Sequence, residues 1–158
     1  MTFVERNKAR ERETTAHWEK LAAAVQEAVK DYNSQSQPNT FAQWQCDRHV
    51  GEDVCTVAGR RFDPVRGREV TYRLVCGLAQ ELRRIDSGIE QAKHEPFNLI
   101  EVETRMAVLS SGETEKIEAK SYEIVPENAE TPFRRKNDDK LLTLEQVTDD
   151  ILWQFLNR

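Results

Sequence analysis

Cys46, His49 and Cys55 are residues of types that ligate metals or act as nucleophiles, and they lie within ten positions of one another. A zinc site needs three or four ligands, usually in closely spaced pairs. Here two residues separate Cys46 from His49, five separate His49 from Cys55, and no second pair or fourth ligand follows. We therefore expect no metal and favour packing of two small apolar thiols. A redox pair and a metal site are the alternatives.

Other patterns for catalysis are weaker. His17, His49 and His94 are scattered, and none stands in a nucleophile motif such as G-x-S-x-G. The six glycines occur singly, so no phosphate-binding loop is expected. Catalytic carboxylates need desolvation, whereas Glu103 and Glu118 are expected to be solvated and paired. We expect no catalytic residue and no cofactor.

A basic patch is a further candidate site. Its members cluster on one predicted hairpin: Arg60, Arg61, Arg66, Arg68 and Arg73. The whole chain is acidic, with 23 Lys and Arg against 28 Asp and Glu and a net charge of −5. The net charge therefore does not favour binding to nucleic acid. Nucleic-acid binders also place stacking aromatics on an exposed sheet face. We favour an ordinary solvated face, with an acidic protein partner as the first alternative and nucleic acid as the weaker one.

The length and the cysteine content limit the class of protein. A chain of 158 residues has the size of one domain and can build a core without a metal or a disulfide. No apolar run approaches the roughly 18 residues of a membrane span, and the first residues lack the apolar stretch of a signal peptide. Three cysteines without framework spacing fit reduced thiols. We expect a single cytoplasmic domain over residues 1–158, not bound to a membrane.

Hydrophobic spacing predicts three helices. The first begins near the caps Thr14 and Thr15 and continues through Trp18 to Tyr32, and residues 1–13 form a charged leader that extends the helix or frays. The second spans the apolar stripe from residue 78 to residue 92. The third follows Thr143, which has a glutamine at the capping-box position. Pro38 is expected to end the first helix region.

The segments between the helices predict strands. Residues 40–76 form three strands, with a loop at 49–52 and a turn at 62–67, and the apolar side chains then share one face. The cross-strand pairs that follow are Arg48–Asp53, Cys46–Cys55, Trp44–Val57, Arg61–Arg68, Gly59–Val70 and Val57–Tyr72. Like charges directly opposite each other are unfavourable, so the arginine pair is the weak point.

Residues 97–125 predict two further strands. A loop at residues 110–113 pairs Met106 with Ile117 on the core face. On the other face it pairs Arg105 with Glu118 and Glu103 with Lys120. Opposite charges in direct pairs predict a solvated face that carries no chemistry. Residues 126–140 form a flexible polar connection to the last helix.

These elements predict an α+β fold with an antiparallel sheet of about five strands, in the order α-β-β-β-α-β-β-α, and with helices packed on one face. This order resembles that of the type III secretion chaperone and YbjN-like fold, whose members bind other polypeptides without catalysis. The resemblance implies a chaperone-like or adaptor-like role.

The last helix has an unusually wide apolar arc. Its members are Leu144, Val147, Ile151, Leu152, Phe155 and Leu156, with Trp153 almost opposite the first of them. A one-sided surface helix needs an arc of only somewhat over 100°. Either the helix is wedged between the sheet and another element, or Leu152, Trp153 and Leu156 form a docking or dimer surface.

We expect a non-enzymatic protein-binding or interaction module, with a protein partner or a second copy of the chain. The alternative is a small-ligand or enzyme domain whose pocket lies between sheet and helices, lined by Trp44, Tyr72 and Cys76. A third hypothesis is a nucleic-acid binder that uses the arginine-rich hairpin and shows a salt-dependent affinity.

Overall fold

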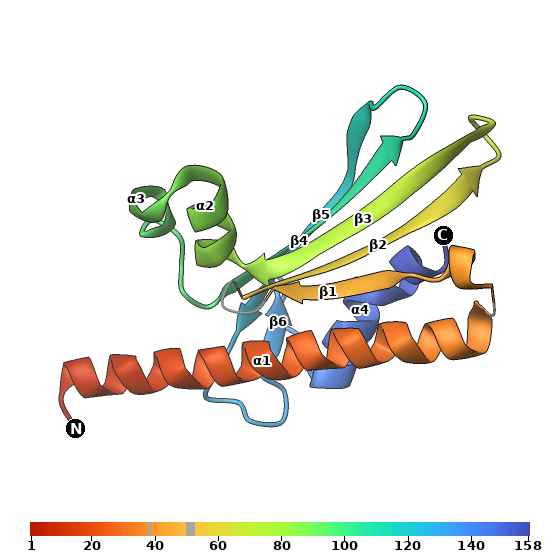
Figure 1. Cartoon of the computed structure of the whole chain (residues 1–158). Helices are drawn as coiled ribbons and strands as arrows, with labels where there is room; N and C mark the ends of the chain where they lie inside the picture. The colour runs from red at the N-terminus through yellow and green to blue at the C-terminus, as the bar shows by residue number, and fades with distance from the viewer. Residues whose placement is uncertain (38, 50–52) are drawn as a thin grey trace.

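The computed structural model describes residues 1–37, 39–49 and 53–158 (Figure 1). It confirms a mixed helix and sheet fold, with a curled antiparallel sheet of seven strands instead of five, ordered β1 to β7 as in the chain. The strands are β1 (Gln45–His49), β2 (Val54–Asp63), β3 (Arg68–Leu78), β4 (Leu99–Val108), β5 (Thr114–Ile124), β6 (Phe133–Arg135) and β7 (Leu141–Leu142). The helices are α1 (Phe3–Ser36), α2 (Ala79–Ser87), α3 (Ile89–Ala92) and α4 (Leu144–Leu156), and a short 3-10 turn, η1 (Thr40–Ala42), precedes β1.

The long helix α1 begins earlier than predicted. A capping box starts it, in which Thr2 Oγ1 accepts a hydrogen bond from the Glu5 amide at 3.2 Å and the Glu5 carboxylate accepts one from the Thr2 amide at 2.9 Å. The charged leader is therefore part of the helix, and Thr14 is a buried residue inside it instead of a cap. Pro38, predicted as the helix breaker, lies outside the described residues.

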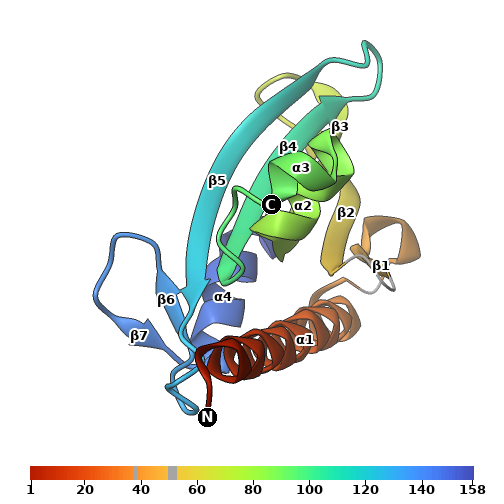
Figure 2. The same ribbon diagram turned by 90° about the vertical axis from the view of Figure 1, so that its left-hand side faces the viewer.

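The helices lie on both faces of the sheet, which corrects the prediction that all pack on one face (Figures 1 and 2). The inner face carries Cys55, Val57 and Leu74, which form one core with α1 and α4. On the outer face, Leu82 and Ile85 of α2 border a hollow. The sheet residues that line it alternate along the strands with the residues of the inner face. Gly88, at φ 92°, separates α2 from α3, so the predicted single helix over residues 78–92 is two short ones.

Helix α4 contacts both the sheet and α1, as expected for a helix wedged between two elements. The core it shares with them is nearly free of solvent: Trp18, Leu21, Val25 and Val29 from α1, Tyr122 and Phe133 from the sheet, and Val147, Ile151, Leu152, Phe155 and Leu156 from α4. At the carboxyl end of α4, the Trp44 indole Nε1 donates a hydrogen bond to the Leu156 carbonyl at 3.1 Å. The Trp44 ring also packs against Phe155, with ring centres 4.6 Å apart.

The first three strands have the predicted faces but different partners. Cys46 opposes Val57 and Cys55 opposes Cys76, so the two thiols predicted to be opposite are diagonal neighbours. Each pairing is displaced by two residues, which preserves the face because side chains alternate with period two. The first loop falls partly on residues 50–52, outside the described part.

The turn between β2 and β3 explains the second displacement. The Asp63 carboxylate accepts a hydrogen bond from the Val65 amide at 3.0 Å, and Gly67 adopts φ 64°. Asp63 then opposes Arg68, and Arg61 opposes Val70. An opposite-charge pair thus replaces the predicted pair of arginines, which removes the unfavourable contact.

The register of β4 and β5 was predicted wrongly. A bulge shifts it between Thr104 and Arg105, so that Thr104 opposes Glu118 while Arg105 opposes Lys116. A shift of one residue moves side chains to the opposite face, so Glu118 and Lys120 lie on the inner face and not with Glu103 and Arg105. The ion pairs form within each strand, Arg105 with Glu103 and Lys120 with Glu118.

Of the two additional strands, β6 lies in the segment at residues 126–140 that was predicted as a flexible connection, and β7 directly follows that segment. Phe133 is fully buried and opposes Ile124 where β6 pairs with β5. The short strand β7 then pairs with β6 and leads into α4. Across the described part of the chain, no helix combines the length and the apolar character needed to cross a membrane.

We predict that Gly59→Ala lowers the free energy of unfolding by about 1–3 kcal/mol, because a Cβ atom there would lie 2.6 Å from Cε3 of Trp44. Urea denaturation measures the change. The same substitution in a Trp44→Leu background is the control, and it should cost much less because the ring that blocks the Cβ is absent. An equal cost in both backgrounds would show that the clash with the ring does not explain the glycine.

Candidate functional site

Trp153 is the surface aromatic of α4. It is 68% exposed, whereas the neighbouring apolar residues Ile151, Leu152, Phe155 and Leu156 are all 5% exposed or less. Leu152 and Leu156, which the sequence grouped with Trp153 as one surface, therefore lie in the core of the single chain. Of those three residues only Trp153 is presented to solvent.

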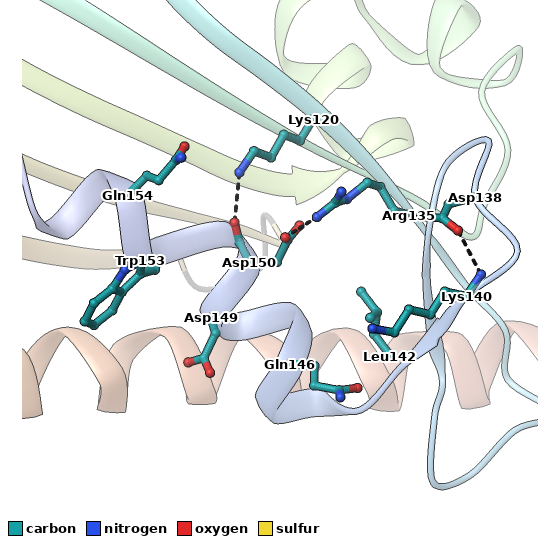
Figure 3. Close-up of a pocket in the computed structure, with 10 residues that line it drawn as sticks. All are labelled: Lys120, Arg135, Asp138, Lys140, Leu142, Gln146, Asp149, Asp150, Trp153 and Gln154. Atoms are coloured by element: carbon teal, nitrogen blue, oxygen red, sulfur yellow. Dashed lines mark hydrogen bonds and ion pairs between the residues drawn. The ribbon is translucent and has the colours of Figure 1, made fainter.

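Two hollows border Trp153. The sheet-side hollow, of about 880 Å³, lies between α4 and the strands β5 to β7, and includes Lys120, Arg135, Lys140 and Gln154 in its lining (Figure 3). The helix-side hollow, of about 450 Å³, lies between α4 and the second half of α1. Both hollows share Asp149 and Trp153, so these two residues form the ridge between them.

An ion-pair network at the floor of the sheet-side hollow holds α4 against the sheet. The Tyr122 hydroxyl donates to one carboxylate oxygen of Asp150 at 2.5 Å, and Arg135 donates to the other. Lys120 Nζ donates to the Asp150 main-chain carbonyl at 2.9 Å (Figure 3). Both carboxylate oxygens are thus occupied, and β5 and β6 are joined to the middle of α4.

The chemistry of this network is suited to support and not to proton transfer. Burial, followed by the hydrogen bond to Asp150, raises the pKa of Tyr122 far above its ordinary value. Tyr122 therefore stays a neutral donor. The described lining of this hollow holds carboxylates, amides and cations, but no histidine, cysteine or hydroxyl nucleophile.

Charge is distributed unequally between the two hollows. The sheet-side hollow has three cations, Lys120, Arg135 and Lys140, against three aspartates. The helix-side hollow has two aspartates and, in its described lining, no lysine, arginine or histidine. Figure 3 shows Asp149 and Trp153 projecting from the side of α4 away from Lys120 and Arg135.

The five arginines of the expected basic patch do not form one surface. Arg61 lies on the inner face, where its guanidinium is 4.0 Å from the centre of the Trp44 ring. Arg66 forms an ion pair with β5, and Arg68 opposes an aspartate across the turn. Arg60 and Arg73 alternate along their strands with the inner-face residues, so they lie on the outer face. The structure thus divides the set between two faces of the hairpin.

The cysteines lie together inside the sheet. Sγ of Cys46 is 3.6 Å from Sγ of Cys55, and Cys55 and Cys76 are fully buried. The hydrogen bond from Cys55 lowers the pKa of Cys46, whereas burial raises the pKa of Cys76 to about 12. The side chain of His49 lies outside the described part, within which no group of three or more His, Cys, Asp or Glu is placed to hold a metal ion.

The residues named for a ligand pocket pack elsewhere. Trp44 and Cys76 lie in the core, and Tyr72 is half-buried with the Arg158 guanidinium 5.2 Å from its ring centre. A hollow between sheet and helix does occur, of about 440 Å³, but it lies on the outer face beneath α2. Leu82 and Ile85 line it, and their helical spacing was visible in the sequence as a core stripe.

No protein-family model, no curated protein and no solved structure matches this chain. The resemblance in element order to the type III secretion chaperone and YbjN-like fold therefore receives no support from these comparisons. The function is therefore inferred from the structure of the chain itself.

We predict a large difference in stability between two aromatic truncations on α4. Phe155→Ala should lower the free energy of unfolding by about 3–5 kcal/mol, because it leaves a cavity in the core. Trp153→Ala should change it by less than about 0.5 kcal/mol, because the side chain is exposed. Urea denaturation of the two variants measures both values, and similar losses would show that Trp153 is buried within the chain.

We predict that iodoacetamide modifies Cys46 before the other two thiols in the folded protein. The thiolate is the reactive form, and Cys46 is the half-exposed cysteine with the lowered pKa. Mass spectrometry of peptides at successive times identifies the modified residue. Cys46→Ser should remove the fast reaction and Cys76→Ala should leave it unchanged. Early modification of Cys76 would contradict the placement.

Proposed function

We propose that this chain is a non-enzymatic protein-binding module that docks a polypeptide partner on the outer side of α4, with Trp153 as the anchor. One observation carries the proposal: Trp153 is 68% exposed while the apolar residues beside it on the helix are buried. The fold therefore does not need its indole, which is free to pack against another molecule.

The chemistry of tryptophan supports this role. Tryptophan is enriched among the few residues that dominate the free energy of protein association. Its large rigid ring loses little conformational entropy on binding and combines an apolar surface with an N–H donor. The hollows on its two sides offer space for side chains of the partner next to the ring.

The attachment of α4 supports binding by a rigid surface. The Asp150 network joins the middle of the helix to β5 and β6, and the Trp44 indole joins its last turn to the start of β1. A surface already held in its bound conformation costs less free energy to occupy. The two occupied carboxylate oxygens and the neutral Tyr122 also favour binding over acid–base catalysis at this site.

Panning of a phage-displayed library of random peptides on the immobilised protein tests the proposal. We predict that enriched peptides, once synthesised, bind the wild-type protein and lose at least about tenfold in affinity for Trp153→Ala, which corresponds to about 1.4 kcal/mol. Isothermal titration calorimetry measures the affinities.

Phe62→Ala is the matched control, because Phe62 is a similarly exposed aromatic, at 64%, near the end of β2 and outside the lining of both hollows. It should change the affinity less than twofold. If no enriched peptide depends on Trp153, or if Phe62→Ala has the same effect, the proposal is wrong. Sedimentation velocity adds a second criterion: a dimer that Trp153→Ala dissociates would make a second copy the occupant and overturn the proposal of a separate partner.

A further inference from the structure

We infer that the partner presents a cationic segment, and that a lysine or arginine side chain of this segment occupies the helix-side hollow beside Trp153. This inference rests on the proposed function and specifies the chemistry of the partner. It follows from what lines the hollow between α1 and α4.

The lining of the helix-side hollow combines acidic, aromatic and apolar groups. Asp31 of α1 and Asp149 of α4 supply carboxylates from its two walls. Tyr32 and Trp153 supply aromatic rings, and Leu152 contributes to an apolar floor. These three kinds of surface match the three parts of a basic side chain: the charge, its attraction to a ring face and its methylene stem.

The two carboxylates are available. Both aspartates are exposed, and neither carboxylate has an ion-pair or hydrogen-bond partner among the residues that the structure describes. Asp150, the next residue along α4, differs because Tyr122 and Arg135 occupy both of its oxygens. Asp31 and Asp149 thus leave negative charge on opposite sides of the same hollow, without a cation of the chain in its described lining.

The ends of the two helices increase this negative potential. α1 ends at Ser36 and α4 at Leu156, and the Tyr32 hydroxyl joins these ends by donating to Asn157 Oδ1 at 3.2 Å. The carboxyl end of a helix carries a partial charge of about −0.5. Neither helix has a basic residue in its last turn, and the guanidinium of Arg158 lies against Tyr72 instead.

The sheet-side hollow does not share this character. Its three cations balance its three aspartates, and Lys120 and Arg135 are already engaged with Asp150. Charge complementarity therefore assigns the basic side chain to the helix-side hollow.

The test uses capped synthetic tetralysine, tetraarginine and tetraglutamate peptides with the full chain, read by tryptophan fluorescence. The signal reports the site, because Trp18 and Trp44 are 1% and 2% exposed and Trp153 is the exposed indole. We expect the two basic peptides to change the emission with an affinity that falls as salt is added, and tetraglutamate to have no effect.

The decisive variant removes the two charges without changing shape. Asp31→Asn with Asp149→Asn should weaken binding of the basic peptides at least about tenfold, since two charge-assisted contacts are lost. Glu90→Gln with Glu130→Gln is the matched control, because it removes the same net charge at exposed residues away from this hollow. It should change the affinity less than twofold. Unchanged urea midpoints would show that both double variants remain folded.

The outcomes separate the inference from the proposed function. If both double variants weaken the basic peptides equally, only the overall charge attracts them, and the inference is wrong. If the panned peptides depend on Trp153 but are not basic and bind the Asp31→Asn, Asp149→Asn variant normally, the inference is wrong and the docking function stands. If no panned peptide depends on Trp153, the docking function itself fails.

Discussion

The attachment of α4 is the constraint on which the rest of the structure depends. Asp150 is held by Tyr122 and Arg135 at the middle of the helix, and Trp44 holds the Leu156 carbonyl at its end. With both points fixed, one side of α4 closes the core against the sheet and α1, and the opposite side must present Trp153 to solvent. The same positioning brings α4 beside the second half of α1, which creates the helix-side hollow.

Much of the fold could be predicted from local patterns. Alternation of side chains identified the inner face of β1 to β3, although each pairing is displaced by two residues, because a displacement of two leaves the faces unchanged. The bulge opposite Thr104 had no comparable signal, and it moved Glu118 and Lys120 to the inner face. The strand β6 was missed because its one large apolar residue, Phe133, directly follows Pro132 in an otherwise polar segment.

The candidate site could be predicted only where one helix carries it. The angular position of Trp153 on α4 follows from 100° per residue, so its exposure was foreseeable. The burial of Leu152 was not, because it depends on α1 lying alongside. The pairing of Asp31 with Asp149 in one hollow joins residues far apart in the chain, and no periodicity in either helix encodes it.

The central claim is that a polypeptide docks at Trp153, and the indole N–H signals of the three tryptophans test it most directly. In protein labelled with ¹⁵N-tryptophan, titration with a basic peptide should move the Trp153 signal most, with a saturating dependence on concentration. Trp18, buried in α1 away from the hollows, should stay nearly unchanged. A saturating shift of the Trp18 signal with a stationary Trp153 signal would contradict the account.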